Sequence, residues 1–431
     1  MRVLLFYLLA GTFAAFCAAE KLVVCNYEAK AHLRQGQGQF SIPDLEEALR
    51  YCTHLIYGYA AIDDQSFKLV PLNENFDVLR DNYRLITDLK RRHPKLKVLL
   101  SVGGNDDVSG IDGELNEKYR TILESTVHRL AFVNSAYTLL KEYNFDGLDL
   151  AWEFPETKPK KVKTGLKKAW SSFKSVFTGE KVIDSNAAQH REQFTSLVKE
   201  LKVAFRPDNL LLSLTVLPNI NSTVYYDPKR LSPHLDFIAL HAFDFYTPQR
   251  NGHLADFPSP IYELIDRRED ENVDYWVKYW LNGAPANKIV LGIPTYGRTW
   301  ALQGESKFDE FPITDLEGPG EPGPLTKEAG LLSYPEICTK VTTRTVIPGG
   351  LTKIPDASKR QGVYAYRYPD NNEKGGIWVG YEEPETAATK AQYVKNKGLG
   401  GIAIDDLTLD DFRGVCNNNK FAILKAAVAA L

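Results

Sequence analysis

The sequence predicts an α/β protein built from eight strands that alternate with helices. Eight short apolar segments, rich in Val, Ile, Leu and Tyr, recur along the 431 residues. Most neighbouring segments are separated by stretches with helical periodicity. The composition, 44% hydrophobic and 25% charged, is that of a globular chain with a large core. This alternation is typical of a (β/α)₈ barrel, and taken alone it is also compatible with a doubly wound sheet.

The predicted elements follow one another at regular intervals. The eight strands are LVVCNYE (22–28), HLIYGYAAI (54–62), KVLLSVGG (97–104), GLDLAWEF (147–154), LLLSLTVLP (210–218), FIALHAFDF (237–245), KIVLGIPTYG (288–297) and GIAIDDLTL (401–409). The clearest helical stretches are IPDLEEALRYC (42–52), NYRLITDLKRR (82–92), LAFVNSAYTLLKEY (130–143) and QFTSLVKELKVAF (193–205). Each helical stretch places apolar residues three or four positions apart, as a helix with one buried face requires.

Two connections are too long for this scheme. Residues of about 298–376 are rich in Gly, Pro and Thr and contain the strand-like pieces VTTRTVI and GVYAYRY, which predicts an insertion. Residues of about 156–190 form a lysine-rich loop insertion after the fourth strand. Such a loop is either a solvated face or a contact for a partner or polyanion, with Trp170, Phe173 and Phe177 as candidate anchors.

The chain is predicted to be secreted. Residues 1–19 combine Arg2, an apolar stretch and small residues before Glu20, which is the pattern of a signal peptide. A membrane anchor is the alternative, but the apolar stretch is shorter than the ~20 residues that a span needs, and no later segment is long enough. The balance of 52 basic against 55 acidic residues gives no reason to expect a nucleic-acid partner.

The mature chain keeps an even set of cysteines. Cys17 leaves with the signal peptide, and the four that remain are Cys25, Cys52, Cys338 and Cys416. An even count in a secreted chain predicts two disulfides, for which three pairings are possible. No CxxC or HExxH spacing supports zinc, so no metal and no cofactor are expected. Asn221, in the sequence NST, is the one clear glycosylation sequon.

Residues 145–155, FDGLDLAWEFP, are the strongest signal for chemistry. On a strand, side chains two positions apart share a face, so Asp149, Ala151 and Glu153 are expected to project into one cavity. Carboxylates along one buried strand repel each other and are costly to desolvate. That cost indicates a functional site, and the alanine interrupts the acidic series.

This segment closely resembles the catalytic strand of the chitinases of glycoside hydrolase family eighteen, whose pattern is DGxDxDxE. KVLLSVGG and GIPTYGR (292–298) match further motifs of that family, in order and spacing, over essentially the whole mature chain, 20–431. The resemblance implies a (β/α)₈ barrel with a small α+β insertion after the seventh strand, at about 298–376. It also favours disulfides that pair Cys25 with Cys52 and Cys338 with Cys416.

In that family the last Glu of the pattern, here Glu153, protonates the glycosidic oxygen while the substrate's own acetamide attacks the sugar. Three positions depart from the pattern. Ala151 stands where an Asp orients the acetamide, Phe243 where a Tyr hydroxyl binds it, and Asp405 where a Trp supports the sugar. Together these losses imply a rate deficit of about 10⁴ or more. We therefore expect no chitinase activity.

The remaining site residues have structural interpretations. Glu153 is expected to be a vestige held by hydrogen bonds, and Asp149 and Asp146 to support the barrel floor. His241, which points inward, is expected to be a core residue whose polar atoms are satisfied rather than a metal ligand. We place four residues in a possible sugar cleft: Trp152, Asp244, Tyr296 and Arg298.

Among relatives without chitinase function, the sequence is most similar to the insect imaginal disc growth factors. The shared features are the broken acidic series, the lysine-rich insertion and the segment LHAFDFYTP. The resemblance implies an extracellular factor that stimulates proliferation and motility of imaginal disc cells, in cooperation with insulin-like signalling. Its partner would be a cell-surface receptor or a component of the insulin pathway. Two alternatives stay open: a lectin for chitin oligosaccharides, and a weakly active chitinase that uses Glu153.

Overall fold

The structure is a computed structural model. It describes residues 21–107, 117–155, 157–159, 180–182, 184–304, 306, 311–314, 316–342, 349–370 and 375–431. The predicted signal peptide lies outside the described residues, and so does most of the lysine-rich insertion with Trp170, Phe173 and Phe177. Within the described part of the chain, no helix has the length and apolarity that a bilayer span requires.

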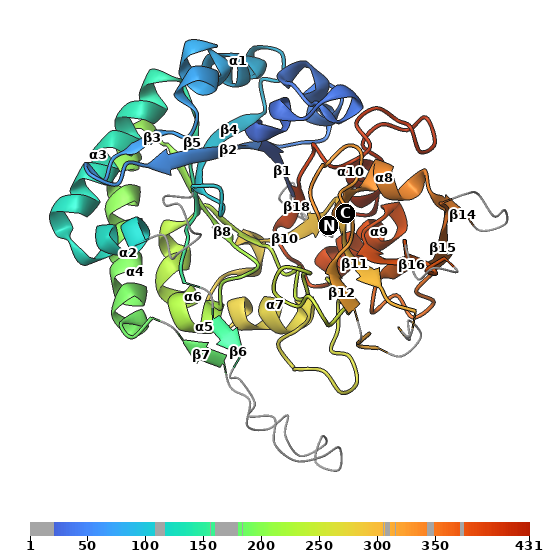
Figure 1. The fold of residues 1–431 in the computed structure, drawn as a ribbon. Coiled ribbons are helices and arrows are strands. Elements are labelled where there is room, and N and C mark those ends of the chain that lie inside the picture. The colour runs from blue at the N-terminus through green and yellow to red at the C-terminus, as the bar shows by residue number, and fades with distance from the viewer. Residues whose placement is uncertain are drawn as a thin grey trace, which may run out of the picture.

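Eight parallel strands close into a barrel, with helices around it (Figure 1). In chain order the strands are β1 (Leu22–Glu28), β2 (His54–Ile62), β4 (Lys97–Gly103), β5 (Gly147–Ala151), β8 (Leu211–Val216), β9 (Phe237–Leu240), β10 (Ile289–Pro294) and β18 (Gly401–Asp405). Strand β1 pairs with both β2 and β18, which closes the ring. The predicted (β/α)₈ barrel is confirmed, and the doubly wound alternative is excluded.

Two buried clusters follow from the alternation of side chains along these strands. Residues from strands around the ring fill the barrel interior: Val24, Ile56, Leu99, Phe237, Ala239, Val290 and Ala403. A larger cluster lies mainly between the strands and the surrounding helices. The longer helices are α1 (Asn82–Asp88), α2 (Glu117–Glu124), α3 (Thr126–Glu142), α4 (Ala187–Phe205), α7 (Val273–Leu281), α9 (Pro384–Asn396) and α10 (Ala422–Ala430).

One predicted helix has a different form. The stretch 42–52 contains two 3₁₀ turns, Ile42–Leu45 and Ala48–Arg50, instead of an α-helix. Its buried residues Ile42, Leu45 and Ala48 lie three positions apart. A repeat of three matches the three residues per turn of a 3₁₀-helix, so this geometry keeps all three side chains on one face.

The insertion after the seventh barrel strand is present as a second sheet. It consists of β11 (Tyr296–Leu302), β12 (Leu316–Pro319), β13 (Leu331–Ser333), β14 (Val341–Thr342), β15 (Leu351–Ile354), β16 (Val363–Arg367) and β17 (Ile377–Tyr381), with the short helix α8 (Tyr334–Cys338). Figure 1 shows it beside the barrel, next to β10 and β18. A further antiparallel pair, β6 (Thr157–Pro159) and β7 (Glu180–Val182), flanks the lysine-rich insertion.

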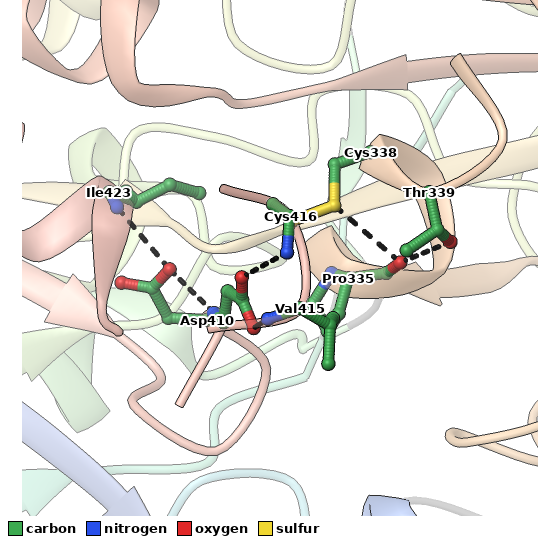
Figure 2. Close-up of a disulfide and its surroundings, with 8 residues drawn as sticks. Pro335, Cys338, Thr339, Asp410, Val415, Cys416 and Ile423 are labelled. Carbon is green, nitrogen blue, oxygen red and sulfur yellow. Dashed lines mark hydrogen bonds between the residues drawn. A yellow bond between two sulfur atoms is a disulfide. The ribbon is translucent and has the colours of Figure 1, made fainter. Parts of the chain in front are cut away.

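Both expected disulfides are present. Cys25 of β1 is bonded to Cys52, and Cys338 of α8 to Cys416. The second bond ties the insertion to the loop between β18 and α10, as Figure 2 shows. In that loop, the Asp410 carboxylate accepts hydrogen bonds from the N–H groups of Ile423 and Leu424 at the start of α10. The bond therefore joins two parts of the fold that are distant in sequence.

Candidate functional site

Asp149 is a fully enclosed carboxylate held by neighbouring strands. It accepts hydrogen bonds from the hydroxyls of Ser101 on β4 and of Ser213 and Thr215 on β8, at 2.6 to 3.1 Å. Burial raises the pKa of Asp149, and the hydroxyl donors oppose that rise. With its oxygens bound to three hydroxyls, Asp149 joins its own strand β5 to the two adjacent strands, β4 and β8.

Asp146 lies at the opposite end of β5. Its carboxylate accepts a hydrogen bond of 2.9 Å from the backbone N–H of Val98 and forms an ion pair of 3.0 Å with Lys90. Its own backbone N–H donates to the Val98 carbonyl at 2.7 Å. These contacts fix the register of β5 against β4, so Asp146 is structural.

Strand β5 ends earlier than predicted. It stops at Ala151, and Glu153 lies beyond the strand. The Ala151 carbonyl accepts a hydrogen bond of 2.9 Å from Gly104 N–H, and a Cβ on Gly103 would lie 2.2 Å from that carbonyl oxygen. Only glycine therefore fits at 103. The Glu153 carboxylate accepts a hydrogen bond of 3.0 Å from the Asn105 backbone N–H that follows this turn.

A cavity of about 790 Å³ opens where the barrel strands end. Its wall includes Glu28 from β1, Asn105 after β4, Pro218 after β8 and Asp405 from β18. Asp149, Ala151 and Glu153 were expected to share one cavity, and they do not share this one. None of the three is among the residues that line this cavity, and Asp149 lines a separate space of about 10 Å³. The reason is that the hydroxyl cage encloses Asp149 and that β5 ends before Glu153.

Three of the four predicted cleft residues line the cavity as one hydrogen-bonded unit. Tyr296 donates its hydroxyl to Asp244 at 2.8 Å, and Arg298 binds the same carboxylate through two nitrogens at 3.0 and 2.5 Å. Burial and the Asp244 charge raise the pKa of Tyr296. Phe243 lies beside them, packed with Tyr296, Leu331 and Leu409, and offers no hydroxyl to a ligand.

Trp152, the fourth predicted cleft residue, is elsewhere. Its side chain is 0% exposed and packs against Tyr119, Phe132 and Phe194, which lie on the surrounding helices. The assignment of Trp152 to the cleft was wrong. Alternation along β5 places position 152 on the face opposite Asp149, so the side chain points toward the helices rather than into the barrel.

Asp405 brings a carboxylate to the wall of the cavity. Its Oδ1 accepts a hydrogen bond of 2.9 Å from the Asn26 amide, and its Oδ2 lies 3.7 Å from Nδ1 of His241. Burial, with Glu28 and Asp244 nearby, raises the pKa of Asp405 to about 7.

Burial lowers the pKa of His241 to about 4, so that ring is neutral at physiological pH. His241 lines the cavity, and its Nε2 has no hydrogen-bond partner among the described residues. The expectation of a satisfied core histidine was therefore wrong.

The rim of the cavity contains charged residues that the sequence analysis missed. Lys30 lies 2.7 Å from Asp106 and 3.2 Å from Glu28, and Arg34 lies 3.8 Å from Glu28. Burial, with Glu28 nearby, raises the pKa of Asp106 to about 6. The signal available in the sequence was the position of these residues just after strands one and three, where barrel sites lie. The described residues contain no group of three or more His, Cys, Asp or Glu arranged to hold a metal ion.

The raised pKa of Asp405 predicts a specific pH dependence. A folded-state pKa of about 7 lies above the ordinary 3.8, so the stability that protonated Asp405 contributes is lost as the pH rises from about 4 to about 7. Asp405→Asn should remove this loss. Compared with wild type, the variant should gain on the order of 4 kcal/mol at pH 8 and close to nothing near pH 4.

Urea unfolding at several pH values measures this difference. Asp208→Asn is a control of opposite sign, because Lys141 lowers the pKa of that exposed carboxyl. Its replacement should reduce stability at neutral pH and have no effect at low pH. Parallel pH profiles for wild type and Asp405→Asn would contradict the assignment.

A barrel of this topology, with an α+β insertion and a cavity at the carboxyl ends of its strands, has its candidate site where (β/α)₈-barrel enzymes have theirs. The chain belongs to glycosyl hydrolases family 18, whose family model matches residues 22–410. It is similar over nearly its full length to chitinase-like proteins of the imaginal disc growth factor type.

Two relatives and two solved structures illustrate this placement. Chitinase-like protein Idgf4 of Drosophila melanogaster is 48% identical, covering 99% of each chain. Imaginal disk growth factor 6 of the same organism is 46% identical, over 94% of this chain and 92% of that one. The Ostrinia furnacalis Group II chitinase catalytic domain 2 matches with a TM-score of 0.78 and 30% identity, over 95% of this chain and 96% of that one. Human YKL-39, a pseudo-chitinase with retained chitooligosaccharide binding properties, matches with a TM-score of 0.74 and 29% identity, over 95% of this chain and 99% of that one.

Proposed function

We propose that this protein is a secreted, chitinase-like growth factor without the hydrolytic activity of its family. The observation that carries the proposal is the composition of the site. Ala151 contributes no carboxylate beside Glu153, Phe243 contributes no hydroxyl to the cavity, and Asp405 contributes no aromatic face. Each absent group would act on the same sugar unit, so the losses affect one step of the reaction.

Glu153 by itself is a weak basis for catalysis. The neighbouring acid, Asp149, is bound to three hydroxyls and lines a small enclosed space of about 10 Å³. Glu153 in turn accepts a hydrogen bond from the Asn105 backbone. A general acid needs a partner that tunes its pKa and a second group that stabilises the cation. Neither is supplied from position 151, so a weakly active chitinase is the less favoured alternative.

The signalling role is proposed from likeness to relatives whose names include imaginal disk growth factor. We propose that the protein stimulates proliferation and motility of imaginal disc cells together with insulin-like signals, through an unidentified cell-surface receptor or pathway component. The apolar N-terminal segment, the two disulfides and the sequon at Asn221 all fit an extracellular protein. The Asn221 side chain accepts a hydrogen bond of 2.9 Å from Thr223 N–H, and its glycosylation stays a prediction.

Growth stimulation should be independent of Glu153. We expect purified wild-type protein and Glu153→Gln to stimulate disc cell proliferation equally in the presence of insulin. The isosteric change removes the proton donor and keeps an oxygen that can accept from Asn105. Cell counts over a concentration series measure the effect, and a reduced, unfolded sample of the same protein is the control. A response lost with Glu153→Gln, together with loss of cleavage of a chitotriose reporter, would support the glycosidase alternative.

A lectin function is a second candidate because the cavity is large enough for sugars. Its volume of about 790 Å³ lies in the range of small-molecule sites. YKL-39, a structural neighbour, is described as retaining chitooligosaccharide binding without being a chitinase. Calorimetric titration with a chitin tetramer tests this candidate directly.

A further inference from the structure

The cavity at the barrel mouth carries more acidic than basic groups. Six of its lining residues are acidic: Glu28, Asp106, Asp244, Asp405, Asp406 and Glu328. Four are basic: Lys30, Arg34, Lys327 and Arg298. Three of these basic residues are engaged with acids of the same wall, since Lys30 and Arg34 contact Glu28, and Arg298 binds Asp244. The wall therefore keeps an excess of acidic groups, although the charge of Arg298 also acts on Asp405.

Asp405 differs from the other acids in its partners. Among the described residues no lysine or arginine forms an ion pair with it, and its hydrogen-bond donor is the neutral amide of Asn26. Its side chain is 18% exposed and reaches both the large cavity and the small space that Asp149 lines. Burial, with the charges of Glu28 and Asp244, raises the pKa of Asp405 in spite of the opposing charge of Arg298 and the hydrogen bond from Asn26.

His241 supplies an independent observation at the same place. The residue is 5% exposed and lines the cavity. Its Nε2 is buried without a hydrogen-bond partner among the described residues, so Nδ1, the ring nitrogen near Asp405, is the atom that a ligand would meet. Its Nδ1 lies 3.7 Å from Asp405 Oδ2, which is too long for a direct hydrogen bond. A group that donates two hydrogens could bind both Asp405 Oδ2 and His241 Nδ1 across that separation. An ammonium is such a group.

We propose that the cavity selects a sugar carrying a free, protonated amine, as in a deacetylated chito-oligosaccharide, over the N-acetylated form. The amine would bind between Asp405 and His241. Its charge would compensate the carboxylate there, and the sugar ring would occupy the space beside Phe243. The neutral acetamide carries no charge that would compensate the carboxylate. The Phe243 ring also offers no hydrogen-bond donor to the acetamide carbonyl. The inference rests on the proposed absence of hydrolysis, because a ligand that is cut would not stay bound.

Calorimetric titration of the intact protein tests the selection. The probes are a glucosamine tetramer and an N-acetylglucosamine tetramer, in a near-neutral buffer in which the sugar amines are largely protonated. We expect the glucosamine tetramer to bind at least about ten-fold more tightly, equivalent to about 1.4 kcal/mol. Equal or tighter binding of the N-acetylated tetramer would overturn the proposal. Tighter binding of the linear polyamine spermidine than of the glucosamine tetramer would also overturn it, because the site would then recognise positive charge without a sugar ring.

A matched pair of variants locates the effect. Asp405→Asn should weaken the glucosamine tetramer about ten-fold or more and leave the N-acetylated tetramer unchanged. Glu328→Gln removes the same charge from another residue that lines the cavity and should change either affinity by less than about two-fold. Equal losses in the two variants would indicate general attraction and overturn the assignment to Asp405. Chromatography of each mixture after titration reports cleavage separately, so hydrolysis would refute the proposed function without obscuring the comparison of affinities.

Discussion

Restoring one residue should not restore chitinase activity. We expect wild-type protein to cleave a fluorogenic chitotriose at least about 10⁴-fold more slowly than an ordinary chitinase, and Ala151→Asp to stay within about ten-fold of wild type. The reason is that Phe243 still gives the acetamide no hydroxyl, while Asp405 still leaves the sugar face without a platform. The new carboxylate would also lie on a fully buried position of the strand that carries Asp149, where desolvation and repulsion disfavour its ionised form.

A combined variant should recover part of the rate. Ala151→Asp with Phe243→Tyr and Asp405→Trp supplies all three missing groups, and we expect a gain of about 10² or more over wild type. Adding Glu153→Gln to that variant is the matched control, and it should abolish the gain because the proton donor is then absent. Turnover of the single variant Ala151→Asp near that of ordinary chitinases would show that the other two positions matter little. Thermal melts of each variant separate lost folding from lost chemistry.

Removing the second disulfide should cost more stability than removing the first. Cys338 and Cys416 are separated by 78 residues, and Cys25 and Cys52 by 27. In the chain-entropy description, the longer loop contributes about 4.5 kcal/mol and the shorter about 3.5 kcal/mol. The longer bond also joins α8 of the insertion to the loop whose Asp410 and Asp411 accept backbone N–H groups (Figure 2). Its loss would release two parts of the fold from each other.

Urea unfolding of the double variants Cys338→Ala with Cys416→Ala and Cys25→Ala with Cys52→Ala measures both costs. Replacing both members of a pair avoids a free thiol. Cys25 lies on β1, where the barrel closes. Its removal therefore also tests the contribution of local packing at the closing strand. A greater loss from the Cys25–Cys52 pair would show that local packing at the closing strand outweighs loop length.

The strand pattern allowed most of the barrel to be predicted. All eight apolar segments became barrel strands, because a strand buried on both faces requires a continuous apolar run whatever surrounds it. Strand ends were harder to place, and the error at β5 mattered most. The run of acids and apolar residues continues to Glu153, but Ala151 is the last residue whose backbone can pair with β4, since the chain there turns past Gly103 and Gly104.

The residues within each motif were enough to predict which groups of the family site are missing, and this prediction required no coordinates. Ala151, Phe243 and Asp405 are visible in the printed sequence, whereas Trp152 was wrongly assigned to the cleft although the alternation along β5 places it outside the barrel. Only the tertiary structure decided what surrounds them. The wall of the cavity brings together Glu28, Asn105, His241 and Asp405, from segments hundreds of residues apart, because closure of the ring sets β1 beside β18. Burial, the pKa of Asp405 and the unpartnered nitrogen of His241 are properties of that enclosure, and no local pattern encodes them.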